Sequence, residues 1–307
     1  MASESELIAA LSAVFTLSDP SFNSFKNVLV GIGDDGAVIK ASPQSSVLAT
    51  DMAVEGVHFK REWSSLHEIG AKITAANLAD IYAMGGDPKY LLVSAGLTAD
   101  FGIAEITELA KGIAEEAALV GASVVGGDIS RAEQLVISIS VFGEVENPIT
   151  RSGAKIGDSV IISGLPGKSA AGLIQLQSGV TDSSFVSAHK KPVVNYQLAK
   201  KFREVSAMCD VSDGLLSELN HIASASDVGI ELDSKLIAEI PGFQDLESAT
   251  KGDIWEVVLS GSEDHAFVAT TSADIPEGAY VIGKVVSGTG VKVSGISKLP
   301  AIGFRHF

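Results

Sequence analysis

Aspartates recur in short segments of glycine and other small residues, and these segments are the strongest chemical signal in the chain. The segments are Gly33-Asp34-Asp35-Gly36, Thr50-Asp51-Met52, Gly126-Gly127-Asp128 and Asp210-Val211-Ser212-Asp213-Gly214, and a further acid, Asp80, ends Asn77-Leu78-Ala79-Asp80. Two carboxylates about 4 Å apart repel by roughly 4 kcal/mol at an effective dielectric constant near 20. If the fold brings these acids together, a cation must hold them.

The ligand type indicates the type of cation. Oxygen ligands without neighbouring cysteine or histidine favour Mg²⁺ or a similar ion. Mg²⁺ bound by a few carboxylates, with water and phosphate completing its shell, is the chemistry of nucleotide phosphoryl transfer. Each segment alone is more typical of a turn, a strand end or a helix surface. Their joint occurrence beside apolar segments that must pack together favours a site.

Four other segments have both a structural and a functional interpretation. His58 could contact a substrate phosphate or serve the fold, and Arg151 could meet a nucleotide or be an exposed charge. Glu263 and Asp264 could recognise a cationic ring or form a turn. Phe304, close to the last residue of the sequence, is expected to dock over either core or ligand.

The elements that would position these residues alternate between helices and strands. Hydrophobic periodicity predicts helices over 5–17, 66–83, 103–120, 169–177, 192–202 and 215–226, and strands over 28–32, 47–50, 90–97, 123–125, 135–145, 160–163, 229–232, 256–259, 265–269 and 280–286. Thr50-Asp51 and Gly126-Gly127-Asp128 are expected where strands end, and Ser212 or Asp213 is expected to cap the helix that follows. The pattern predicts a mixed α/β chain in two halves.

Glycine and proline mark two further features. Gly164–Ser169 is similar to a P-loop, but only Leu165 and Pro166 separate Gly164 from Gly167, where four residues are needed. It is therefore predicted to be a strand-to-helix turn. The polar stretch around Pro148 predicts a boundary between a domain of residues 1–148 and a second of residues 149–307.

Composition excludes some partners. The chain has 307 residues, is 46% hydrophobic and carries a formal net charge of −16, which argues against a nucleic-acid partner. An anionic nucleotide would then require divalent cations. Cys209 is the only cysteine, so we expect a buried thiol in a reducing cytoplasm. Neither a signal peptide nor a run of about 20 apolar residues is present, which predicts no membrane partner.

Taken in order, the motifs identify a family. Besides the acidic segments they include Gly31-Ile-Gly-Asp-Asp-Gly-Ala-Val, Thr50-Asp-Met-Ala-Val-Glu-Gly-Val-His-Phe, Thr150-Arg-Ser-Gly-Ala-Lys-Ile-Gly-Asp, Lys168-Ser-Ala-Ala-Gly-Leu and the closing Gly303-Phe-Arg-His-Phe. Nearly end to end, the chain resembles the thiamine-monophosphate kinases of the AIR-synthetase-like ATP-binding superfamily.

The resemblance implies a two-domain AIR-synthetase-like fold of mixed sheets with helices on one face, and a homodimer joined through the N-terminal sheets. It implies ATP-dependent phosphorylation of thiamine monophosphate to thiamine diphosphate, the last step of thiamine diphosphate biosynthesis, with several Mg²⁺ ions. The N-terminal domain would supply metal ligands, ATP-phosphate contacts and the dimer interface. The C-terminal domain would supply metal and ATP contacts and thiamine recognition. The acceptor phosphate is already ionised, so no catalytic general base is expected.

The resemblance also assigns residues. Metal ligands would be Asp35, Thr50, Asp51, Asp80, Asp128, Asp210 and Asp213; ATP contacts Gly127, Asp128, Arg151 and Ser212; and substrate contacts His58, Glu263, Asp264 and Phe304. The chain departs from the family where Gly-Gly-Glu-Asp-Tyr-Glu is usual and Gly261-Ser262-Glu263-Asp264-His265-Ala266 stands instead. Ile129 and Lys168 are also departures.

Two alternatives stay open at this point. One is another ATP-dependent enzyme of the superfamily, forming an amidine or phosphorylating selenide, although Glu263 and Asp264 with the aromatic terminus favour a cationic aromatic substrate. The other is a cation-binding module without activity. Such a module should space its acids regularly within one loop, and here they extend from Asp34 to Asp213.

Overall fold

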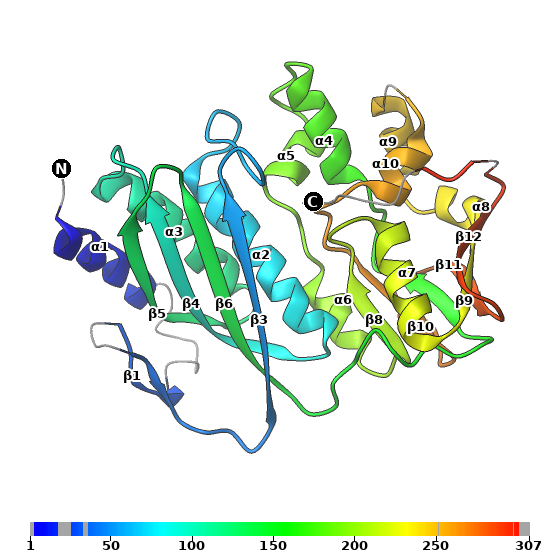
Figure 1. Cartoon of the computed structure of the whole chain (residues 1–307), viewed down its shortest axis with the longest axis horizontal. Coiled ribbons are helices and arrows are strands. Elements are labelled where there is room, and N and C mark those ends of the chain that lie inside the picture. The colour runs from blue at the N-terminus through cyan, green and yellow to red at the C-terminus, as the bar shows by residue number, and fades with distance from the viewer. Residues whose placement is uncertain (1–2, 18–25, 33–35, 251, 297, 301–307) are drawn as a thin grey trace. The chain divides into compact units, whose positions relative to one another are not determined.

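The computed structural model describes residues 3–17, 26–32, 36–250, 252–296 and 298–300 (Figure 1). The chain divides into two compact units: unit 1 contains residues 1–81 and 86–146, and unit 2 contains residues 82–85 and 147–307. The predictions for Asp34, Asp35 and Phe304 fall outside the described residues.

A four-stranded mixed sheet forms the centre of unit 1. Its order is β3 (Ser45–Val54), β6 (Val136–Val145), β4 (Asp87–Leu97) and β5 (Ser123–Arg131). Only β4 and β5 are parallel to each other. A separate two-stranded sheet pairs β1 (Val28–Val30) with β2 (Val38–Ile39). The mixed pairing matches the predicted fold class.

Helices cover one face of this sheet (Figure 1). They are α1 (Glu4–Leu17), α2 (Leu66–Ala83) and α3 (Ile103–Ala118). Two glycines allow α2 and α3 to approach at backbone distance: a Cβ at Gly70 would lie 2.3 Å from Leu109 O, and one at Gly112 would lie 2.0 Å from His67 O. Ile137 and Ile139 of β6 are fully buried, whereas Leu48 and Met52 of β3 are 59% and 58% exposed. The sheet therefore has a covered face and an open face.

Unit 2 contains a six-stranded mixed sheet. Its order is β12 (Gly290–Ser294), β9 (Gly229–Asp233), β11 (Tyr280–Val286), β7 (Ser159–Ile162), β10 (Phe267–Thr271) and β8 (Ala207–Asp210). The pairs are antiparallel except for β12 with β9. The helices are α4 (Lys168–Gln177), α5 (Ser184–Lys190), α6 (Tyr196–Lys201), α7 (Leu215–Ser226), α8 (Ser234–Ala238), α9 (Phe243–Ala249) and α10 (Ile254–Ser260). Cys209 is buried in the core, as predicted.

Several predicted elements differ from the structure. Residues 254–260 form α10 rather than a strand, and the side chain of Asp253 accepts a hydrogen bond from the amide of Trp255 at its start. The helix predicted from residue 192 begins at Tyr196, because Asn195 caps it through the amide of Leu198. Helix α5 was not predicted. The turn at Gly164–Ser169 joins β7 to α4, as expected.

Two strands are longer than predicted. Asp51 lies within β3 and Asp128 lies within β5, rather than at the strand ends. Their partners explain the difference, since β3 pairs with β6 and β5 with β4 well beyond these acids. The cap prediction for α7 was also wrong, because the residue at its N-cap is Gly214, with no side-chain hydrogen bond.

Candidate functional site

The acids of unit 1 are positioned by the sheet and by α2. The side chain of Asn77 is fully buried; its Oδ1 accepts a hydrogen bond from the amide of Asp51 at 2.9 Å, and its Nδ2 donates to Ile73 O at 2.9 Å. Asn77 thereby ties the exposed Asp51 on β3 to α2. Asp80 is half-buried one helical turn after Asn77.

Strand alternation separates the oxygen groups of the sheet. The open face carries the side chains of Thr50, Ser94 and Asp128. Asp51 pairs with the buried Ile139 and therefore shares the face of the sheet on which Ile139 lies. Thr50 Oγ1 donates to the backbone carbonyl of Ile139 at 3.1 Å. On the open face, Ser94 of β4 therefore lies beside Asp128 of β5, and Thr50 lies on β3 at the opposite edge of the sheet.

Gly127 allows the strand that carries Asp128 to approach β4. A Cβ at Gly127 would lie 1.9 Å from the carbonyl oxygen of Val93, a distance that no side chain can occupy. By contrast, a Cβ at Gly126 would meet only the terminal Cδ2 of Leu92, at 3.0 Å. The glycine that matters for position is the one directly before Asp128.

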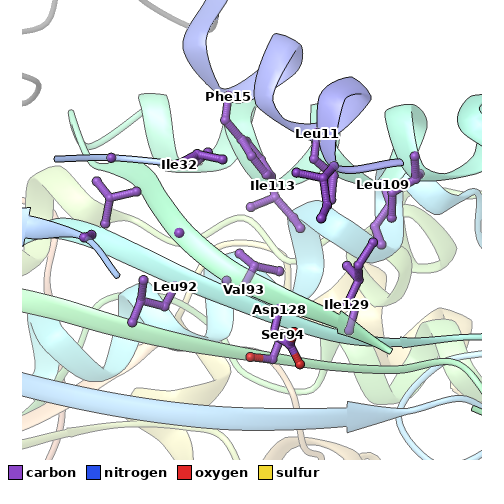
Figure 2. A pocket seen from close by; sticks show the side chains of 18 of the residues that line it. Leu11, Phe15, Ile32, Leu92, Val93, Ser94, Leu109, Ile113, Asp128 and Ile129 are labelled. Carbon is purple, nitrogen blue, oxygen red and sulfur yellow. The ribbon is translucent and has the colours of Figure 1, made fainter. Parts of the chain in front are cut away.

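An apolar pocket of about 600 Å³ adjoins this glycine segment (Figure 2). Helix α1 contributes Leu11 and Phe15, and α3 contributes Leu109 and Ile113. Gly126, Gly127 and Asp128 line it too, as do Gly31, Ile32, Gly36 and Ala37, which flank the segment 33–35. Figure 2 shows the carboxylate of Asp128 on the side of the strands away from α1. This pocket was not predicted from the sequence, although Ile106, Leu109 and Ile113 are spaced along one face of α3.

His58 follows β3 and has a defined tautomer. The amide of Val54 donates to His58 Nδ1 at 3.0 Å, and an amide can only donate. Nδ1 is therefore unprotonated, and Nε2 carries the ring hydrogen. The buried Lys72 donates to the carbonyl of His58 at 3.3 Å. The imidazole is thus held as a donor through Nε2.

In unit 2, two loops are joined by backbone hydrogen bonds. Val211 N donates to Ala266 O at 2.7 Å, His265 N to Val211 O at 3.0 Å, and Glu263 N to Ser212 O at 2.8 Å. The segment Asp210–Gly214 therefore continues the pairing of β8 with β10. This arrangement brings the Asp210 segment and the Glu263 segment together, which sequence spacing does not reveal.

Arg151 is paired with a buried acid. Its Nη2 lies 3.5 Å from Glu218 Oε2, and the Glu218 side chain is 1% exposed while that of Arg151 is 53% exposed. Burial raises the pKa of Glu218, and the charge of Asp210 raises it further. His221, 3.3 Å from the same oxygen, acts in the opposite direction. The contact with Glu218 orients the guanidinium of Arg151, and about half of the Arg151 side chain stays open to solvent.

The adjacent acids Glu263 and Asp264 have different environments. Asp264 accepts hydrogen bonds from the amides of Gly167 at 2.6 Å and Ser169 at 3.0 Å, at the N-terminus of α4. Desolvation raises the pKa of Asp264 to about 6, although these two amides act against it. Glu263 is partly exposed, with Oε2 3.8 Å from Nδ1 of the buried His189. Both residues are partly exposed, and they differ in that both carboxylate oxygens of Asp264 accept hydrogen bonds from backbone amides.

The donor set is suited to a hard cation. The described part of the chain contains no group of three or more His, Cys, Asp or Glu side chains placed to hold a metal ion by themselves. Mg²⁺ is usually bound by one or two carboxylates, with water and phosphate oxygens as its other ligands. The carboxylates of Asp51, Asp128, Asp210 and Asp213 and the hydroxyl of Thr50 are oxygen donors of this kind. They fit Mg²⁺ that arrives with a nucleotide.

Family comparisons match both halves of the chain. Residues 33–145 match AIR synthase related protein, N-terminal domain, and residues 155–296 match AIR synthase related protein, C-terminal domain. The structure is similar to AaThiL complexed with AMPPCP and TMP, with a TM-score of 0.79 and 31% identity, over 99% of this chain and 97% of that one. Thiamine-monophosphate kinase from Stenotrophomonas maltophilia gives a TM-score of 0.81 at 27% identity, over 96% and 98% of the two chains.

A sequence relative narrows the assignment. Thiamine-monophosphate kinase of Mycobacterium tuberculosis is 38% identical over 267 residues, which are 85% of this chain and 80% of the relative. The chain belongs to the AIR synthase related family and, within it, to the thiamine-monophosphate kinases. The family and the fold predicted from the motifs are confirmed. In the described residues, no helix has the length and apolar character needed to cross a membrane.

Proposed function

We propose that the chain catalyses transfer of the γ-phosphoryl group of ATP to thiamine monophosphate. A phosphate oxygen of thiamine monophosphate attacks the γ-phosphorus, the bond from that phosphorus to the β-bridging oxygen breaks, and its electron pair leaves with ADP. The product is thiamine diphosphate. The observation that carries this proposal is the end-to-end similarity to AaThiL complexed with AMPPCP, an ATP analogue, and TMP.

The nucleotide site is proposed to be the pocket of unit 1. Its apolar lining, with Phe15, Leu109 and Ile113, suits an adenine base. Gly126, Gly127 and Asp128 also line this pocket, and Gly127 and Asp128 are proposed as ATP contacts. Arg151 and Ser212 are proposed as further ATP contacts. The outward-facing guanidinium of Arg151 suits a phosphate.

Magnesium ions are proposed to be held by carboxylate and hydroxyl oxygens. These are Thr50, Asp51, Asp80, Asp128, Asp210 and Asp213, with Asp35 outside the described residues. When bound, Mg²⁺ neutralises the phosphate charge that would otherwise be repelled by a chain of net charge −16. No side chain acts as a general base, because the attacking phosphate oxygen is already ionised.

Substrate recognition is proposed to use His58, Glu263 and Phe304. The Nε2–H group of His58 can donate to the substrate phosphate, since Nδ1 is engaged by Val54. The carboxylate of Glu263 complements the cationic thiazolium ring, and Phe304 would contact the rings. In this proposal Asp264 holds the start of α4 through its two amide hydrogen bonds and does not contact the ligand. In this proposal Glu263 is the member of the pair that meets thiamine.

A homodimer is proposed to form through the sheet of unit 1. Among the described residues β3 is an edge strand of this sheet, and the open face exposes Leu48 and Met52. A second copy that packs on this face would cover both side chains. A location in the cytoplasm also stays a prediction, based on the single buried thiol.

The direct test measures ADP release from ATP with purified protein and thiamine monophosphate, in the presence and absence of Mg²⁺. We expect release only when both are present, with formation of thiamine diphosphate. Thiamine, selenide and a formyl-amide substrate serve as matched alternatives, which represent the other activities of the superfamily. ADP release with one of these, and none with thiamine monophosphate, would overturn the proposal.

A further inference from the structure

His265 and Asp210 form a buried pair that the motifs did not predict. His265 Nδ1 lies 2.9 Å from Asp210 Oδ2, and the two side chains are 8% and 5% exposed. Asp210 ends β8 and His265 lies two residues before β10, and these two strands pair with each other. A carboxylate accepts, so Nδ1 of the histidine donates. The bond engages one oxygen of the carboxylate.

The backbone around this pair is held in an unusual conformation. His265 has φ of +50° and Glu263 has φ of +64°, in the left-handed region that residues other than glycine uncommonly adopt. The hydrogen bonds of the two residues to Val211 and Ser212 keep the loop there. Backbone strain of this kind persists where the surrounding structure fixes it, and it clusters at functional sites. Here its effect is to aim the imidazole at Asp210.

Asp210 has a second acid as a neighbour. The charge of Asp210 raises the pKa of the buried Glu218, so the two carboxylates lie within electrostatic range of each other. Glu218 has its own partners in Arg151 and His221. Asp210, the other acid of the pair, accepts a hydrogen bond from His265. Without it, a buried carboxylate would be free to change its rotamer in response to like charge.

We propose that His265 is a positioning residue, which fixes one oxygen of Asp210 so that the other is presented to magnesium. The proposal rests on the proposed function, in which Asp210 is a metal ligand. Ligating carboxylates and histidines are commonly oriented by such partners, and losing the partner costs about 10- to 100-fold in metal affinity.

Two variants distinguish the effect of the hydrogen bond from the effect of the backbone conformation. His265→Gly removes the donor, and glycine accepts φ near +50° without strain. His265→Asn also tolerates this φ, and its Nδ2 stands where Nδ1 of histidine stood, so the donor is retained. His67→Ala, at a half-exposed histidine paired with Glu115 in unit 1, is the control. Urea unfolding establishes that each variant is folded.

The readout is binding rather than turnover. Calorimetry with AMPPCP at increasing Mg²⁺ gives the magnesium concentration for half-maximal nucleotide binding. We expect this concentration to rise about 10- to 100-fold in His265→Gly, to stay within about threefold of wild type in His265→Asn, and not to change in His67→Ala.

Three outcomes are decisive. Wild-type magnesium dependence in His265→Gly would overturn the positioning role, and so would equal losses in His265→Gly and His265→Asn when both are folded. If His265→Gly does not fold, the inference is decided by His265→Asn, which must then keep the wild-type dependence. A wild-type protein that binds AMPPCP without any magnesium dependence would refute the proposed function itself, which is a different result.

Discussion

The amide of Asp51 donates to Oδ1 of Asn77, 26 residues later in the chain, and so the edge strand β3 is fixed to helix α2. Asn77 is fully buried and uses its other amide atom on Ile73 O. One side chain therefore connects the position of a proposed metal ligand to the packing of the main helix of unit 1.

Replacing Asn77 should disturb both stability and catalysis. We expect Asn77→Ala to lower the free energy of unfolding by about 1–3 kcal/mol, because two side-chain hydrogen bonds are lost and the amide of Asp51 loses its acceptor. Urea denaturation measures the first effect, and kcat/KM for ATP at limiting Mg²⁺ measures the displacement of Asp51. Asn77→Asp, which keeps the Oδ1 acceptor, should retain more of the activity than Asn77→Ala. Equal losses would argue against the role of Oδ1.

The two glycines before Asp128 should differ sharply in tolerance. In Gly127→Ala the added Cβ would meet the backbone oxygen of Val93 at 1.9 Å, so β4 and β5 must separate. We expect about 2 kcal/mol or more of destabilisation and a large loss of nucleotide affinity. Gly126→Ala meets only a flexible leucine terminus and should cost less than half as much. Thermal unfolding and AMPPCP titration test the contrast, and similar behaviour of the two variants would refute it.

Asp264 should give the protein a pH-dependent stability. Its pKa is raised to about 6 in the folded chain, from an ordinary value near 4. Below about pH 4 the group is protonated in both states. As pH rises toward 6 the unfolded chain loses this proton first, so stability declines, by up to about 3 kcal/mol once the folded group has also ionised.

Asp264→Asn removes this titration. Urea unfolding between pH 4 and 7.5 should show wild type losing stability relative to the variant as pH rises, on top of a constant cost for one lost amide hydrogen bond. Parallel profiles would mean that the carboxyl group of Asp264 titrates normally.

Asp128 should be required for turnover and dispensable for folding. Its side chain is exposed on the open face of the sheet, so Asp128→Asn should change the free energy of unfolding by less than about 0.5 kcal/mol. Turnover should fall at least about 100-fold, because Mg²⁺ would lose a charged ligand. Removal of Mg²⁺ by EDTA from wild type should have the same effect and be reversed by added Mg²⁺. A variant with near wild-type turnover would remove Asp128 from the proposed metal ligands.

Replacing Glu263 should change KM for only one of the two substrates. We expect Glu263→Gln to raise KM for thiamine monophosphate about tenfold, because the charge that complements the thiazolium is lost, while KM for ATP changes little. Glu256→Gln, at an exposed acid of α10, is the matched control. Steady-state kinetics with each substrate varied in turn provides the measurement. A change in KM for ATP instead would indicate that Glu263 contacts the nucleotide.

Local patterns in the sequence predicted much of the fold. Helix α2 over Leu66–Ala83 and helix α7 over Leu215–Ser226 follow the expected ranges, because their apolar periodicity and glycine-marked ends are local properties. The segment 256–259, predicted as a strand, lies within helix α10. A short apolar run has no clear period, and packing as well as the Asp253 cap makes it a helix.

The identity of the chemical groups was determined by the sequence itself. Acids, glycines and their order in the chain established the family, because ligand chemistry and backbone freedom belong to the residue types. The environments of those groups depend on tertiary structure. Asp264 binds the start of α4 while Glu263 stays accessible, and His265 meets Asp210 across 55 residues of chain. Such contacts depend on strand pairing and burial, which bring together residues that no local spacing relates.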